Sequence, residues 1–271
     1  MTIVARAGRT LLLMLFASAG TILLVRFAPG FFSDSREMDA KYATAARSEM
    51  QAQNQHQVKS WLHGDLGQSR QYNVPVVQLL GARARVSAWL LAQGIFLGWL
   101  LAACTALPVS RLPQGGLLWG APFTLLLSIP TAAMATACIL SDAGGPVLVL
   151  SLLIAARDFK FLRSMLHRAW RSPHLLQGRA QGLPAGALLR THILPNVTPQ
   201  LCALSTLSIV TALGALVPIE VIFTVPGLGQ LAWSAVMNRD LPVLVAVSLL
   251  MACVVGFAGM LSTRTVTLEA A

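Results

Sequence analysis

Long apolar stretches alternate with polar ones along the chain. Three windows contain no Asp, Glu, Lys or Arg: 86–110, 191–219 and 241–263. A helix needs about 20 predominantly apolar residues to cross the ~30 Å hydrocarbon core of a bilayer, and each window is long enough. A fourth apolar run follows Arg6 and Arg9, and its bulky end favours an uncleaved span over a cleaved signal peptide. The pattern predicts membrane-spanning helices at about 10–29, 86–108, 197–221 and 241–262.

The window 112–156 predicts two more spans. It carries a single charge, Asp142, and is too long for one helix. The run Ser141–Pro146 (SDAGGP) has the composition of a turn, which divides the window into spans at about 117–140 and 144–160. The chain is therefore predicted to be an all-α integral membrane protein with six transmembrane helices.

The basic residues predict how these spans are oriented. The loop 157–196, between the fourth and fifth spans, contains seven Lys or Arg residues and one acid, Asp158. Short loops rich in Lys and Arg remain in the cytoplasm, so this loop is expected there, as are both Arg-bearing termini. The first transmembrane helix, 1–29, is then followed by an external segment, 30–85. The transmembrane domain comprises the remainder, 86–271.

Composition agrees with a bilayer as the main solvent. The 271 residues are 55% hydrophobic and 11% charged, against about 25% charged in a soluble domain. The net charge of +10 lies at span ends and in one loop, and no soluble domain is visible that would present it to a nucleic acid. The cysteines have no spacing typical of a disulfide framework or a metal site, and no metal or cofactor is expected. They are Cys104, Cys138, Cys202 and Cys253.

The loop 157–196 itself has helical punctuation. A helix from Arg157 to Arg171 is expected to continue the fourth span. A short helix over 174–181 should stop at Gly182, the residue type best suited to a left-handed position after a helix. Pro184 suits the first turn of a further helix, which is expected to break at Pro195. This compact basic element fits either a docking site for another protein or an ordinary helical connector.

Three stretches carry a family resemblance. The run Gly64–Ser69 (GDLGQS) is similar to a GDxGxS signature, and Arg179–Leu183 (RAQGL) with Pro195–Asn196 is similar to a cytoplasmic loop of the form ARAKGL followed by RNA. The run Glu220–Gly229 (EVIFTVPGLG) with Arg239–Pro242 (RDLP) is similar to ETIFxxPGLG followed by RDYP. In this order and spacing, they make the chain resemble the inner-membrane permease of peptide-type (dipeptide, oligopeptide or nickel) ABC importers, first-permease branch.

The resemblance implies a division of labour. The chain would form half of a translocation path in the bilayer of the bacterial inner membrane, for a peptide, a nickel or metallophore complex, or a similar small solute. It would act with a second permease subunit, two ATPase subunits and an extracytoplasmic substrate-binding protein. No GxxxxGK[ST] motif is present, so ATP would be hydrolysed by a partner and not by this chain. The residues expected to couple to the ATPase are Gln177, Gly178, Arg179, Ala180, Gly182, Leu183 and Asn196.

Glu220 is the remaining candidate site residue. Acids within membrane spans are costly and often functional, so Glu220 is a candidate for the translocation path. The nearby Pro226–Gly227 allows a second interpretation, in which Glu220 lies at the membrane surface and pairs locally. Two other functions stay open at this point: an integral-membrane enzyme or its accessory subunit, and a secondary carrier, although no internal repeat typical of carriers is visible.

Overall fold

The computed structural model describes residues 66–112, 115–173, 175, 178, 180–238 and 240–268, together with the isolated residues Gly8, Leu12, Phe16 and Gly20. Within 115–119 and 261–268 the backbone alone is described. The predicted span 10–29 and most of the predicted external segment therefore lie outside the described residues.

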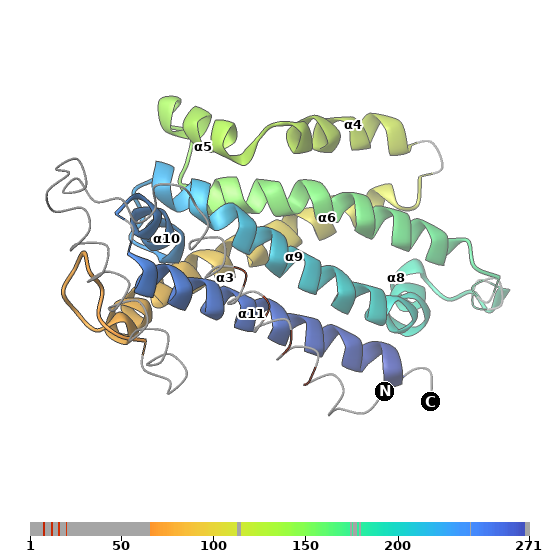
Figure 1. Cartoon of the computed structure of the whole chain (residues 1–271). Helices are drawn as coiled ribbons and strands as arrows, with labels where there is room; N and C mark the ends of the chain where they lie inside the picture. Colours follow the sequence, from red (N-terminus) through yellow and green to blue (C-terminus); the bar gives the residue numbers. More distant parts are fainter. Residues whose placement is uncertain are drawn as a thin grey trace, which may run out of the picture. The chain divides into compact units, whose positions relative to one another are not determined.

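The described secondary structure is helical, apart from one isolated bridge between Gln68 and Pro75 (Figure 1). The elements are α3 (Val76–Val109), α4 (Gly115–Ser128), α5 (Thr131–Leu140), α6 (Pro146–Trp170), α8 (Ala185–Leu188), the π-helical turn η2 (Leu189–Ile193), α9 (Leu194–Ile222), α10 (Leu228–Met237) and α11 (Leu241–Leu268). They belong to two compact units, one of Met1–Val86 with Pro226–Gly256 and one of Ser87–Val225 with Phe257–Ala271.

Within the described part of the chain, three helical segments are long and apolar enough to cross a membrane. They are Val76–Val109, Ala185–Ile222 and Leu241–Met260, with mean hydropathies of 1.9, 2.0 and 2.6. These helices cover the predicted spans at 86–108, 197–221 and 241–262 and meet the length and hydropathy that a span requires. The count rises to four if the α4–α5 pair is one broken span.

The predicted span at 117–140 is not one helix. α4 ends at Ser128 and α5 begins at Thr131, and the two are bent by 96°. Pro130 explains the break: it donates no backbone hydrogen bond and disfavours the helical conformation of the residue before it. Pro130 itself is extended, with φ −57° and ψ 139°. In Figure 1, α6 lies between this bent pair and α9, in agreement with its contacts to all three helices.

The predicted break at Pro195 is wrong. One helix runs without interruption from Ala185 to Ile222, 38 residues, through α8, η2 and α9. The turn before the proline is widened to π-helical geometry, in which the Leu194 N–H bonds to the Leu189 carbonyl. This wider turn accommodates a proline that would clash with a carbonyl in a regular α-helix. By contrast, the predicted helix at 144–160 does continue past Arg157, since α6 is one helix of 25 residues. α6 is not among the described helices that are long and apolar enough to cross a membrane, so the fourth span stays a prediction.

α3 packs closely on α6 within the larger unit. Small residues recur every four positions along α3, and Ala102 and Ala106 are fully buried. A Cβ added at Gly94 would lie 2.5 Å from Cδ2 of Leu150, and one added at Gly98 would lie 2.8 Å from Cβ of Ile154. These glycines let the helices approach, as small residues do in membrane helix pairs. The Gly-x-x-x-Gly spacing of Gly94 and Gly98 is readable in the sequence.

A buried apolar core lies where α3 and α6 end. It joins Ala106 and Val109 of α3, Leu166 and Trp170 of α6, and Leu188 of α8. Phe123 of α4 and Phe159 of α6 stack with ring centroids 4.0 Å apart. The residues that follow α6 are therefore packed onto the helix ends.

Candidate functional site

The predicted coupling residues lie where the chain turns between α6 and α8. Gly182 has φ +74°, in the left-handed region as expected. The Leu183 N–H bonds to the Gly178 carbonyl at 3.2 Å, which is the long-range hydrogen bond of a Schellman helix terminus. Ala180 and Gly182 are exposed, and a Cβ added at Gly182 would meet no atom within 4 Å. The turn therefore closes on a hydrogen bond and leaves an open, exposed tip.

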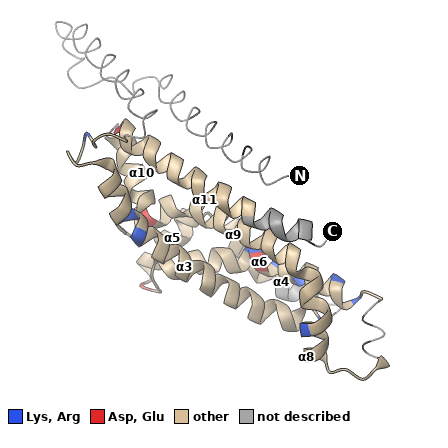
Figure 2. Cartoon of the chain, turned by 90° about the horizontal axis from the view of Figure 1, so that it is seen from below, with Lys and Arg blue, Asp and Glu red and all other residues tan. Residues whose placement is uncertain are grey.

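The base of this turn is packed rather than exposed. Gly178 is buried, and a Cβ there would lie 2.6 Å from Cδ2 of Leu188. Leu183 is half-buried and packs against the same core as Leu188. Asn196 lies further on, exposed on the first turn of α9. Gln177 and Arg179 lie outside the described residues. In Figure 2, Lys and Arg are sparse along the helices and recur near α8.

Glu220 is placed differently from the surface position that Pro226–Gly227 suggested. Its side chain is fully buried in the last turns of α9. The Ser87 hydroxyl of α3 donates a hydrogen bond of 2.6 Å to Glu220 Oε1. The partner is thus far away in the sequence, so the acid connects two helices. Its role on a translocation path stays a prediction.

A buried polar network was missed by the sequence analysis, which counted its charges only toward topology. Asp158 of α6 is fully buried, and Arg157 Nε and Nη2 lie 3.1 and 2.9 Å from Asp158 Oδ1. Arg157 also donates to the Leu207 carbonyl of α9 at 3.0 Å. The signal for this network was Asp158 itself, because one acid in a strongly basic segment indicates a specific partner.

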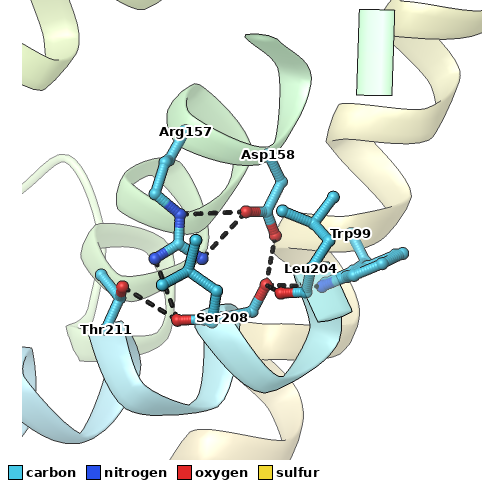
Figure 3. Close-up of polar contacts among 7 residues, drawn as sticks. Trp99, Arg157, Asp158, Leu204, Ser208 and Thr211 are labelled. Atoms are coloured by element: carbon cyan, nitrogen blue, oxygen red, sulfur yellow. Dashed lines mark hydrogen bonds and ion pairs between the residues drawn. The ribbon is translucent and has the colours of Figure 1, made fainter. Parts of the chain in front are cut away.

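A serine extends the network to a third helix (Figure 3). Ser208 of α9 donates a hydrogen bond of 2.6 Å to Asp158 Oδ2 and accepts one of 3.1 Å from Trp99 Nε1 of α3. Through Ser208, the network therefore joins α3, α6 and α9. Removing one member of a buried ion pair leaves an uncompensated charge, which costs about 3–5 kcal/mol.

The smaller unit brings together two of the stretches that carry the resemblance. Ser69, from the run Gly64–Ser69, donates a hydrogen bond of 2.5 Å to Oδ2 of Asp240, which precedes α11. The Gln71 N–H lies 3.2 Å from the same oxygen, and the Tyr72 N–H donates to Ser69 Oγ at 3.0 Å. In this stretch Gly67 has φ +75°, in the left-handed region, while Asp65 lies outside the described residues.

This contact holds the segment before α3 against the start of α11. Asp240 and Ser69 are both buried, and an apolar cluster beside them joins Val76 of α3, Leu231 of α10 and Val243 of α11. Among the described residues, no group of three His, Cys, Asp or Glu side chains is arranged to hold a metal ion. The polar clusters described here connect helices.

Comparison with known proteins shows which family this chain resembles. Residues 94–268 match the family described as "Binding-protein-dependent transport system inner membrane component". The dipeptide transport system permease protein DppB of Lactococcus lactis is 27% identical over 212 residues, covering 70% of each chain. The oligopeptide transport system permease protein OppB of Escherichia coli is 27% identical over 217 residues, covering 71% of this chain and 70% of that one.

Two further comparisons bear on a shorter segment and on the fold. The metal-staphylopine import system permease protein CntB of Staphylococcus aureus is 34% identical over 107 residues, 40% of this chain and 34% of that one. An inward-facing structure of the MetNI methionine ABC transporter contains a chain of the same fold, with a TM-score of 0.54 at 18% identity, covering 70% of this chain and 97% of that one.

The family match covers well over half of the chain, and it includes the α6–α8 turn, Glu220 and the Asp158 network. In such systems ATP hydrolysis belongs to a separate ATPase subunit, and a binding protein delivers the substrate. The chain belongs to the family of inner membrane components of binding-protein-dependent transport systems, and it is an integral membrane permease of an ABC importer rather than an enzyme.

Proposed function

We propose that this chain is one of two permease subunits of a bacterial inner-membrane importer, and that the turn at Gly178–Leu183 contacts an ATPase subunit. The observation that carries the proposal is the closed, exposed tip at Gly182 on a buried base. A tip that is hydrogen-bonded and packed at its base can pass a displacement on to the helix beneath it. In this proposal six spans cross the membrane, and both termini lie in the cytoplasm with the 157–196 loop.

The helix that follows the turn provides a path for this displacement. It runs without a break from Ala185 to Ile222, about 57 Å at 1.5 Å per residue. The base of the turn lies against Leu188 at one end of this helix, and Glu220 is buried near the other. Movement of the tip by the ATPase would shift the whole helix, and with it the Ser87–Glu220 contact.

For the cargo we infer a peptide or a metal–metallophore complex, as the names of the relatives indicate for those proteins. Glu220 is the residue proposed to lie on the path, because it is a buried acid in an apolar helix and an acid there attracts a cationic group. The substrate-binding protein would select the cargo before it reaches the permease.

Affinity purification from gently solubilised membranes tests the proposal. The wild type is expected to bring down an ATPase and a second permease, with ATPase activity in the eluate. Gly182→Asp places a charge on the tip and should lose the ATPase. Gly81→Asp is the matched control. Gly81 is exposed near the N-terminal end of α3, and a Cβ added there would meet no atom within 4 Å. Absence of any ATPase from the wild-type eluate, or equal loss in both variants, would refute the proposed contact.

A further inference from the structure

A hollow of about 800 Å³ lies where α3 and α6 end and the chain turns toward α8. All of its described lining residues belong to the larger unit. Its volume falls within the range of sites that bind small molecules, about 300–1,000 Å³. Neither the relatives nor the proposed ATPase contact assigns a role to this hollow.

The polar wall of the hollow is basic. Arg111, His167 and Arg171 line it, and no acid is among the described lining residues. Of the acids in the described part of the chain, Asp158 and Asp240 have the partners given above, Glu220 bonds to Ser87, and Asp142 lies in the turn after α5. The positive charge in the hollow is therefore not offset by a described carboxylate.

Two contacts orient this basic wall. The Arg111 guanidinium lies 5.0 Å from the centroid of the Trp170 ring, which holds the cation against an aromatic face. His167 Nδ1 lies 2.9 Å from the Ser110 carbonyl oxygen. Because a carbonyl only accepts, Nδ1 carries a hydrogen, and Nε2 remains as the ring nitrogen that can meet a ligand.

Leu175, Leu183 and Leu188 form an apolar wall of the hollow. A free inorganic ion would gain nothing from these leucines, whereas the glycerol and first methylenes of a lipid would bury against them. An anionic headgroup joined to an apolar body is therefore the ligand chemistry that matches both walls.

We propose that this hollow binds the phosphodiester headgroup of an anionic phospholipid such as phosphatidylglycerol. Arg111 and Arg171 would contact the phosphate, and Trp170 would lie at the headgroup level, where Trp is enriched. Basic pockets between membrane helices on the cytoplasmic side bind anionic lipids. The lipid would brace the base of the α6–α8 turn, since Leu183 and Leu188 belong both to the hollow and to the core beneath the tip. The cytoplasmic location rests on the topology proposed above, but the binding site does not.

Binding is tested on the full importer as it purifies, after removal of native lipid with detergent. Short-chain phosphatidylglycerol, short-chain phosphatidylcholine and inorganic phosphate are titrated separately, and bound lipid is counted by native mass spectrometry alongside the lipid-dependent shift in Tm. The paired substitution Arg111→Gln/Arg171→Gln is compared with Arg168→Gln, which alters an exposed arginine of the same helix end that does not line the hollow. Because arginines at helix C-termini also stabilise the helices, the readout is the lipid-dependent shift and not Tm itself.

The expected result is selective binding of phosphatidylglycerol, weakened about tenfold or more in the paired variant and unchanged in Arg168→Gln. Three results would overturn the proposal. They are equal binding of both lipids, an equal loss of lipid binding in Arg168→Gln, and competition by inorganic phosphate at the same concentration. The proposal would also be overturned if the paired variant lost the ATPase but bound lipid as before, because that result would assign the hollow to the ATPase contact. Selective lipid binding in a preparation without any ATPase would support this inference while the proposed function failed.

Discussion

Substitution of Gly98 by Ala tests the close packing of α3 on α6. In a helix, Gly→Ala normally stabilises by about 0.8–1 kcal/mol, because Ala has the higher helix propensity. At Gly98 the added Cβ would lie 2.8 Å from Cβ and 2.9 Å from Cγ2 of Ile154, and 3.0 Å from the Ser151 carbonyl oxygen. None of these atoms is the far end of a flexible side chain, so the helices themselves have to separate.

Such overpacking costs about 1–3 kcal/mol, which equals or exceeds the gain in propensity. Gly120→Ala in α4 is the matched control, because its Cβ would meet nothing within 4 Å. We therefore expect Gly98→Ala to be less stable than Gly120→Ala by about 1–3 kcal/mol, or roughly 2–12 °C in Tm at about 2–4 °C per kcal/mol.

The assay is thermal unfolding of the detergent-solubilised protein, followed by tryptophan fluorescence and by recovery from size-exclusion chromatography. A Tm for Gly98→Ala equal to or above that of Gly120→Ala would refute the close approach of α3 to α6. Gly94→Ala is expected to be milder than Gly98→Ala, since the atom nearest its Cβ is Cδ2 of Leu150, at the end of a side chain that can rotate.

Three further predictions concern the polar contacts and the turn. Arg157→Met leaves the buried Asp158 carboxylate uncompensated and should lower the free energy of unfolding by about 3–5 kcal/mol. The double variant Arg157→Met/Asp158→Asn should recover most of this loss, and Tm measurements of the single and double variants that show no recovery would contradict the pairing. Gly182→Val should strain the left-handed turn by about 1–2 kcal/mol and reduce stimulation of the ATPase. Gly182→Asn should keep the stability of the turn and the ATPase stimulation near wild type, and limited proteolysis and ATPase rates show whether the two variants differ. Ser69→Ala removes the hydroxyl bonded to Asp240 and should lower local stability by about 1–3 kcal/mol. Amide hydrogen exchange at Gln71 and Tyr72 should therefore become faster, and unchanged exchange would argue against the contact.

Much of the fold was readable because its signals are local. Charge-free windows predicted the helices around 86–108, 197–221 and 241–262, and bilayer thickness dictates how long such windows are. Gly182 was predicted as a left-handed position because only a residue without Cβ adopts that conformation at no steric cost. The order of the three resemblance stretches pointed to the family that the comparisons show.

The wrong predictions share one cause: the identity of a single residue does not determine how a turn or a neighbouring helix is arranged around it. Proline breaks the chain at Pro130 but not at Pro195, since a preceding π-helical turn accommodates the second ring. Glu220 was assigned a surface alternative because of the Pro-Gly nearby, yet α3 covers it with Ser87. Neither result follows from the segment alone, because each depends on how a turn or a neighbouring helix is placed.

The sequence by itself determined that the chain is a helical membrane protein, where its longest spans lie, and which turn closes on a glycine. These properties follow from transfer of apolar residues into lipid and from local backbone sterics, which act within about 20 residues. Only the tertiary structure decided that Asp158 meets Ser208, that Ser69 meets Asp240, and that a basic hollow opens where α3 and α6 end. Those contacts join residues far apart along the chain, and only helix packing brings their side chains within hydrogen-bonding distance.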